Sequence, residues 1–183
     1  MKTKQDYWQI DIPKGLTLNK AIDDCKKLFL VWSYYGNLDE GVTENDRTSE
    51  KSYTVWVKKN VEADEENKNL SAGELKEKGH MGITLLERIV LEINYFKETG
   101  KHLDMDNITL CSGSRNRDGF VPRADWRGKF DVGWYNASFR FPDLRSRSAF
   151  SSLPLNLESS DTLTLESAIK LVKKEGYKIY KEL

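Results

Sequence analysis

The sequence predicts an α+β domain, in which an antiparallel or mixed sheet of about five strands packs against a central helix at about 83–99 and two further helices. Three observations point to this class. Segment 83–99 carries apolar residues at the three- and four-residue spacing of a helix. Segment 52–58 alternates apolar and polar residues, as a half-buried strand does. Segment 129–141 also alternates, although its phase changes near the middle.

The length and composition suit one domain. The chain has 183 residues, of which 38% are hydrophobic and 32% are charged. Five Trp, eight Tyr and seven Phe compensate for the low hydrophobic fraction, because each aromatic side chain can bury about 150–250 Å². We expect a single globular domain over 1–183 with a polar, acidic excursion at about 39–78. Residues 39–66 hold nine acids and four bases, which is typical of a solvated surface segment.

The first half of the chain predicts short elements with clear ends. Segment 30–35 is apolar and aromatic, so it fits either a strand or an extension of the helix before it. Thr17 is a candidate N-cap, and the pair Ser71 and Glu74 fits a capping box. We expect a strand at 7–13, a helix at 18–29, a strand at 52–58 and a short helix at 72–78.

The central helix at 83–99 has the strongest local signals. Thr84 and Glu87 form a second capping-box pattern, and Gly100 is a natural C-terminal stop. Its wide apolar stripe predicts a position in the middle of the molecule. The polar side chains are expected to form a solvated face of this helix: Glu87, Arg88, Glu92 and Lys97.

The second half predicts strands and loops before a closing helix. Segment 107–111 favours a strand that enters a polar loop at 112–119, and 120–126 favours extended chain because of Pro122. The change of phase within 129–141 predicts a bulge or tight hairpin near Tyr135 and Asn136. Segment 143–157 is expected to be irregular, and 160–177 to be a helix.

Several classes of protein are disfavoured. The N-terminus is too polar for a signal peptide, and no apolar run approaches the about 20 residues that cross a bilayer. We therefore expect a soluble, cytoplasmic protein without a membrane partner. Cys25 and Cys111 are expected to be free thiols. Together with His80 and His102 they show no zinc-type spacing, so neither a metal nor a cofactor is predicted.

The arginines are the most informative feature for function. Although the chain balances 29 Lys+Arg against 29 Asp+Glu, seven of its nine arginines lie in an arginine window at 115–147. Arginine suits carboxylates, phosphates and aromatic faces. The small residues of the 111–118 loop could also direct backbone N–H groups at an anion. The predicted anion-binding residues are Ser112, Ser114, Arg115, Arg117, Arg123 and Arg127. Trp126, between Asp125 and Arg127, is the predicted aromatic platform.

Three classes of function stay open. The first is a non-enzymatic binding module whose 111–147 face engages an anionic partner, either nucleic acid or an acidic protein. The second is a small enzyme for a phosphate- or carboxylate-bearing substrate, with the 111–118 loop as anion cradle and an Asp, His80 or Cys111 in the chemistry. The third is a self-assembling protein without a ligand. A pocket that joins the 111–118 loop to a carboxylate or histidine would favour the enzyme. A flat arginine surface would favour the binding module.

Overall fold

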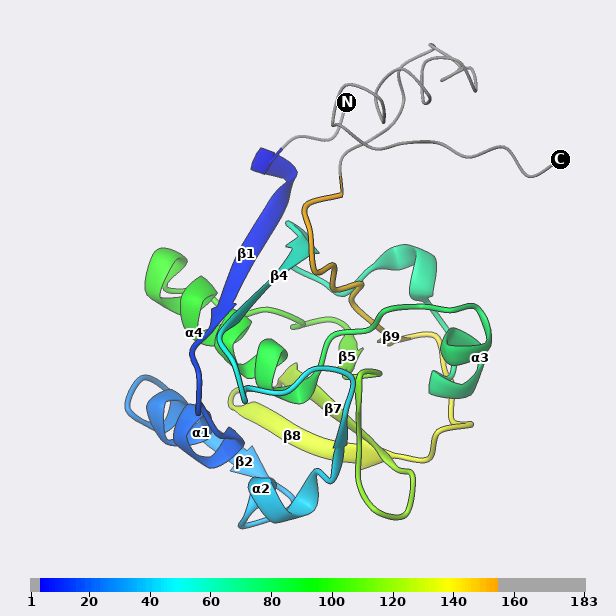
Figure 1. Ribbon diagram of the computed structural model, residues 1–183, viewed down its shortest axis with the longest axis horizontal. Coiled ribbons are helices and arrows are strands. Elements are labelled where there is room, and N and C mark those ends of the chain that lie inside the picture. The colour runs from blue at the N-terminus through cyan, green and yellow to red at the C-terminus, as the bar shows by residue number, and fades with distance from the viewer. Residues whose placement is uncertain (1–3, 155–183) are drawn as a thin grey trace, which may run out of the picture. The chain divides into compact units, whose positions relative to one another are not determined.

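The computed structural model describes residues 4–154; the helix predicted at 160–177 lies outside them. Two 3₁₀ turns, Lys4–Asp6 and Glu65–Asn67, accompany four helices and nine strands in the described residues (Figure 1). The helices are α1 (Leu18–Lys26), α2 (Leu38–Gly41), α3 (Ala72–Glu77) and α4 (Leu85–Thr99). The strands are β1 (Tyr7–Ile12), β2 (Val31–Ser33), β3 (Glu44–Asn45), β4 (Tyr53–Lys58), β5 (Ile108–Leu110), β6 (Ser114–Arg115), β7 (Val121–Trp126), β8 (Phe130–Tyr135) and β9 (Leu144–Arg145).

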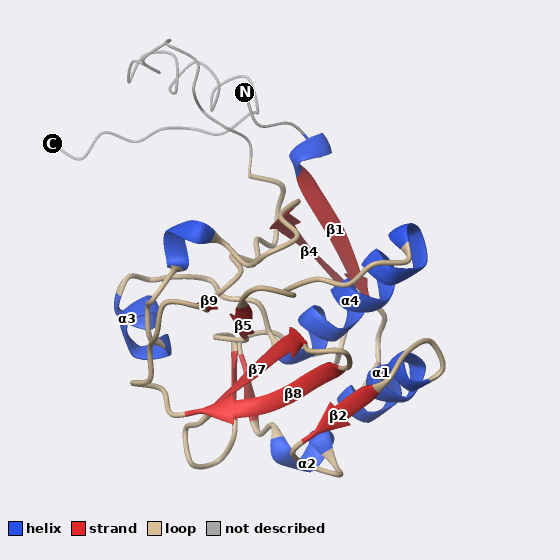
Figure 2. Ribbon diagram, turned by 180° about the vertical axis from the view of Figure 1, so that it is seen from behind, coloured by secondary structure: helices blue, strands red, loops and turns tan. Residues whose placement is uncertain are grey.

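The main sheet has five strands in the order β2-β8-β7-β5-β9. The central pairs β8–β7 and β7–β5 are antiparallel, whereas the outer pairs β2–β8 and β5–β9 are parallel. Figure 2 shows β2, β8 and β7 side by side in this sheet. Two small ladders, β1–β4 and β3–β6, complete the strand pairing. The α+β class with a mixed five-stranded sheet is therefore confirmed.

Helix α4 is the central helix that the sequence predicts. The Thr84 side chain accepts from Glu87 N, and the Glu87 carboxylate accepts from Thr84 N, so both halves of the capping box form. Gly100 ends the helix in the left-handed conformation, with φ of 69°. The apolar side chains of α4 pack in the larger core with those of α1, β1, β4 and β8.

The prediction of a solvated face on α4 is wrong for three of its four residues, and Lys97 is exposed as predicted. Glu87, Arg88 and Glu92 are all completely buried. The structure surrounds this face with other parts of the chain that carry opposite charges, and these partners are described below. A buried charge is tolerated only with such partners, which explains how a helix face that resembles a surface lies inside the protein.

A second, smaller core lies against β5, β7 and β9. It joins Ala72 and Leu75 of α3 to Leu110, Val121 and Leu144. Ala137 and Phe141, which follow β8, also pack against this core. Strand β8 ends at Tyr135, so the phase change predicted near Tyr135 and Asn136 marks the end of a strand.

The acidic segment 39–78 contributes to the fold. Strand β4 pairs along its whole length with β1, and Ala63, Asp64 and Asn67 are buried. The ambiguous segment 30–35 contains the short strand β2. Whether 1–183 forms a single domain stays a prediction, because 155–183 are outside the described residues. No helix within 4–154 is long and apolar enough to cross a bilayer.

Candidate functional site

The nine arginines divide into two groups according to their partners. Seven have a carboxylate oxygen within 4 Å: Arg47, Arg88, Arg123, Arg127, Arg140, Arg145 and Arg147. Among the described residues, Arg115 and Arg117 form no such ion pair. Both belong to the 111–118 loop. The arginine window therefore contains five arginines with a carboxylate partner and two without one among the described residues.

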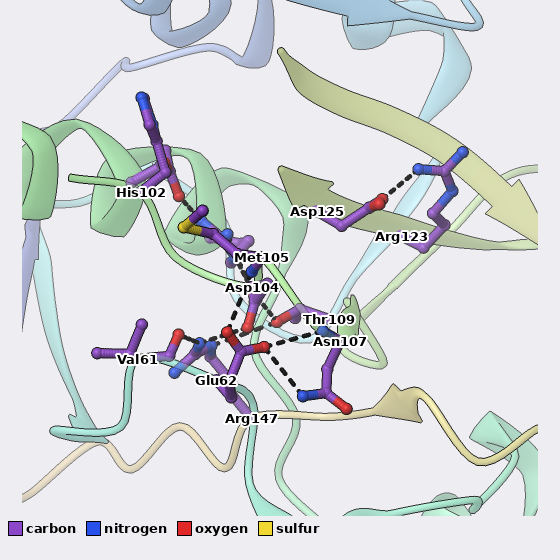
Figure 3. Close-up of polar contacts among 12 residues, drawn as sticks. Val61, Glu62, His102, Asp104, Met105, Asn107, Thr109, Arg123, Asp125 and Arg147 are labelled. Carbon is purple, nitrogen blue, oxygen red and sulfur yellow. Dashed lines mark hydrogen bonds and ion pairs between the residues drawn. The ribbon is translucent and has the colours of Figure 1, made fainter. Parts of the chain in front are cut away.

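The Asp104 network, which we define as Arg88, Glu92, Asp104, Thr109 and Arg147, lies in the core. Asp104 Oδ1 accepts from Arg147 Nη2 at 2.6 Å, and Oδ2 accepts from Arg88 Nε at 2.9 Å and from Thr109 Oγ1 at 2.5 Å. Arg147 also donates to the carbonyl oxygens of residues 60 and 61, each at 2.7 Å. Figure 3 shows Asp104, Thr109 and Arg147 converging there. This network joins α4, β5 and three loops.

The charges of the Asp104 network stabilise one another. Burial raises the pKa of Asp104, but Arg147, Arg88 and the Thr109 hydrogen bond outweigh it, so the pKa lies below its usual value. Burial lowers the pKa of Arg88, yet Asp104 and Glu92 raise it overall. Asp104 and Arg88 are therefore ionised at neutral pH, and the two arginines that share Asp104 are not available to a ligand.

Trp126, the predicted platform, lies at the edge of this network. The Glu92 carboxylate is 2.7 Å from Arg88 Nη1 and 2.9 Å from His102 Nδ1. The His102 ring stacks on Trp126 with an interplanar angle of 5°. The Phe29 ring meets Trp126 edge-on. Trp126 thus packs mainly against the protein, and Trp32 and Tyr34 are more exposed aromatic side chains.

Arg123 and Arg127 share one buried carboxylate. Both form ion pairs with Asp125, which is 1% exposed, and Arg123 also pairs with Asp131. The Arg123 guanidinium lies against Gly133, where a Cβ atom would come within 2.7 Å of Arg123 Nε. These two predicted anion-binding residues therefore have anionic partners within the protein.

The 111–118 loop is held by its own hydrogen bonds. The backbone N–H groups of Ser112, Gly113 and Ser114 donate to the carbonyls of Leu110, Ile83 and Cys111. Ser114 Oγ accepts from Leu85 N and donates to Asn45 Oδ1, and Ser112 Oγ lies 2.7 Å from Ser146 Oγ. Three backbone N–H groups of the expected anion cradle therefore already have acceptors within the protein. An anion at this loop would be bound mainly by side chains.

A pocket of about 340 Å³ lies beside this loop, and we call it the Arg115 pocket. Its lining brings together the loop, β3 and α3: Glu44, Asn45, Asp46, Ala72, Leu75, Lys76, Gly79, His80, Ser112, Gly113 and Arg115. Arg115 Nη1 donates to the carbonyls of Ser112 and Ser114, both at 2.7 Å, which fixes the guanidinium against the loop. Burial lowers the pKa of Arg115 while Asp46 and Glu44 oppose it, but an arginine stays charged at neutral pH.

His80 adds an imidazole to the Arg115 pocket. Burial lowers its pKa, while nearby Asp64 and a hydrogen bond to the Arg147 backbone oppose this shift. A lowered pKa makes the neutral ring the main form at pH 7. Its Nε2 atom is buried and has no hydrogen-bond partner among the described residues. A ligand in the pocket could supply that partner.

The remaining candidates lie elsewhere. Arg117 lines a separate pocket of about 240 Å³ with Tyr35, Asn37 and Asn116 among other residues. Burial raises the pKa of Cys111 to about 12, which argues against a thiolate nucleophile. The part of the chain that the structure describes holds no group of three or more His, Cys, Asp or Glu residues placed to bind a metal.

The predicted site is thus distributed over several places. Ser112 and Arg115 share a pocket, Ser114 supports α4, and Arg117 lines a second pocket. Arg123 and Trp126 lie on β7, and Arg127 directly follows this strand. The sequence did not identify Lys76, Glu44 or Asp46 as neighbours of Arg115. Lys76 lies in α3, Glu44 in β3 and Asp46 directly after β3, and only the tertiary structure brings them to the loop.

Comparison with known proteins adds no assignment. No protein-family model matches the chain. No curated protein sequence and no solved structure matches it either. The function must therefore be argued from the chemistry of these residues.

Proposed function

We propose that this protein is a non-enzymatic binding module and that a small anionic ligand occupies the Arg115 pocket. The observation that carries the proposal is the state of Arg115. It lines the pocket, it is held by two carbonyl oxygens, and it has no carboxylate within 4 Å among the described residues. A preorganised guanidinium binds carboxylate or phosphate oxygens through strong, charge-assisted hydrogen bonds.

The other lining residues narrow the class of ligand. Lys76 and Arg115 contribute two positive charges, and Glu44 and Asp46 contribute two negative charges. This mixture favours a ligand that carries one acidic group together with hydroxyl or ammonium groups over a highly charged polyphosphate.

A long nucleic acid is a poorer fit. Such a chain derives its affinity from several phosphate contacts, and five of the seven arginines in the window already pair with carboxylates. A pocket of about 340 Å³ also suits a small molecule. A cytoplasmic setting, which the sequence predicts, is part of this proposal.

Arg115→Ala and Arg117→Ala make a matched test. Both arginines belong to the same loop and neither forms an ion pair with a described residue, but Arg115 lines the pocket of about 340 Å³ and Arg117 lines the separate one of about 240 Å³. Binding of inorganic phosphate and of small hydroxy- and amino-carboxylates is measured by calorimetry at low salt. We expect Arg115→Ala to weaken binding at least tenfold, because a hydrogen bond to a charged group contributes about 1.5–3 kcal/mol. Arg117→Ala should leave it unchanged. Equal losses in both variants, or no binding by the unaltered protein at millimolar ligand, would refute the proposal.

One observation favours the enzyme as a second candidate. The neutral His80 ring lines the same pocket, and its Nε2 has no hydrogen-bond partner in the described part of the chain, as expected of a general base without its substrate. A panel of phosphate and carboxylate esters is assayed with the unaltered protein and with His80→Gln. Turnover that disappears in His80→Gln while ligand binding persists supports the enzyme, and absence of turnover with every ester supports the binding module.

A further inference from the structure

Strand β2 forms an open edge of the main sheet. Among the described strands it is the end strand of the sheet and pairs only with β8. Leu30 O accepts from Phe130 N at 2.8 Å, and Tyr34 N donates to Val132 O at 3.0 Å. Because alternate residues bond across a parallel pair, the backbone N–H and C=O groups of Val31 and Ser33 are directed away from β8. Within 4–154 no other strand pairs with these groups.

The same edge carries an apolar strip. Leu30, Trp32 and Tyr34 are 74%, 41% and 67% exposed. As alternate residues of an extended segment they share one face of the sheet. Proteins usually protect an exposed apolar edge with charges, proline or a covering segment, because it pairs readily with another chain.

Most charges beside the strip already have partners within the protein. Lys129 lies over the Trp32 ring at 5.3 Å, and Asp131 is the register partner of Trp32 on β8. Arg123 pairs with both Asp125 and Asp131, and Arg127 pairs with Asp125. Among the described residues this leaves Lys129 as the unpaired charge beside the strip. A single positive charge suits a neutral protein strand better than a phosphate backbone, which needs several such contacts.

We propose that β2 pairs with β2 of a second copy of this chain, antiparallel and centred on Trp32. This register is self-complementary. It places Val31 of one copy opposite Ser33 of the other, and the outward groups of each such pair can exchange two hydrogen bonds. It also places Leu30 opposite Tyr34 and the two Trp32 side chains next to each other on one face. A two-fold interface requires this matching of a surface with itself.

The size of the contact sets its strength. Two short strands bury less than the about 1,200–2,000 Å² of a standard stable interface. The dimer is therefore weak and forms reversibly at high protein concentration. It joins the sheets of two molecules edge to edge. The Arg115 pocket, which lies beside α3 and β6, is outside the contact.

Sedimentation of the full chain over a range of concentrations tests the dimer. The mass should rise from the 21.2 kDa of one chain towards twice that value. Hydrogen exchange measured in parallel should show that the amides of Val31 and Ser33 become protected as concentration rises. A constant monomer mass at every concentration, or a dimer without added protection of these amides, would overturn the proposal.

Two variants test the pairing itself. Ser33→Pro removes an outward N–H without removing a bond to β8, and an edge strand tolerates proline at such a position. Trp32→Lys places two positive charges next to each other at the two-fold axis. Both should stay monomeric with little change in melting temperature, whereas Met105→Lys, at another exposed apolar residue, should dimerise normally. A dimer that persists in Trp32→Lys refutes the register even if Ser33→Pro fails to fold.

Discussion

The Asp104 network and the Arg115 pocket both contain arginines, but these arginines have different kinds of partner. In the network, Arg88 and Arg147 are completely buried and share Asp104. At the pocket, Arg115 has only carbonyl oxygens as hydrogen-bond partners in the described structure. Both regions draw on the arginine window. The contrast teaches that clustering of arginines along the sequence does not identify a binding face, because a carboxylate partner decides whether an arginine is available.

The largest expected effect comes from Asp104→Asn, which leaves two buried arginines without their shared carboxylate. Asp104 has a φ of 54°, and asparagine also tolerates this left-handed conformation, so the change tests the charge. We expect a loss of about 3–5 kcal/mol in the free energy of unfolding by urea.

Asp23→Asn is the matched control. Asp23 pairs with Lys26, and both side chains are more than half exposed. A surface pair of this kind contributes at most about 1 kcal/mol. If the two variants lose similar stability, the contrast between buried and exposed charges is wrong.

The second prediction concerns the close packing that positions the 111–118 loop. A Cβ atom on Gly113 would lie 2.7 Å from Gly82 O and 3.2 Å from Ile83 O, and backbone atoms cannot easily move aside. Gly113→Ala should cost about 1–3 kcal/mol of unfolding free energy. Gly36→Ala, which would meet no atom within 4 Å, should be nearly neutral. A neutral Gly113→Ala would show that the loop is not held in this way.

Acid should weaken the Asp104 network selectively. The folded-state pKa of Asp104 is lowered, so its stabilising contribution is present above the unfolded-state value of about 3.9 and is lost as the pH falls through the folded-state value. Unfolding midpoints measured from neutral pH to acid should therefore fall more steeply for the unaltered protein than for Asp104→Asn. Parallel pH profiles would contradict this role.

The smallest expected effect is the reactivity of the thiols. Burial raises the pKa of Cys25 and of Cys111 to about 12, and the thiolate is the reactive form. Mass spectrometry after brief treatment with iodoacetamide should find both thiols unmodified in the folded protein and modified in urea. Rapid alkylation of Cys111 in the folded protein would restore it as a candidate nucleophile.

The sequence predicted the elements whose signals are local. Helix α4 lies between its caps Thr84 and Gly100, and these caps are formed by residues within the helix and next to it. Strand β4 follows the alternation in its own segment. The solvated face on α4 was a wrong prediction because the partners of Arg88 come from Asp104 and, through it, from Arg147. A pattern within one helix contains no information about such distant contacts.

The candidate site shows the same limit. The sequence identified the loop with Ser112 and Arg115, because small residues and arginines lie close together there. It could not show that Asp125 pairs with Arg123 and Arg127, or that Lys76 and His80 lie beside the loop. These facts depend on strand pairing and on the position of α3.

Thermal unfolding of Arg115→Ala, with and without the anion that binds the unaltered protein, tests the central claim most directly. The claim is that Arg115 serves a ligand while the paired arginines serve the fold. We predict that the variant melts only slightly below the unaltered protein without ligand, because it loses the hydrogen bonds to Ser112 O and Ser114 O, and that ligand no longer raises this temperature. A variant that is destabilised as strongly as Asp104→Asn, or that ligand still stabilises fully, would contradict the claim.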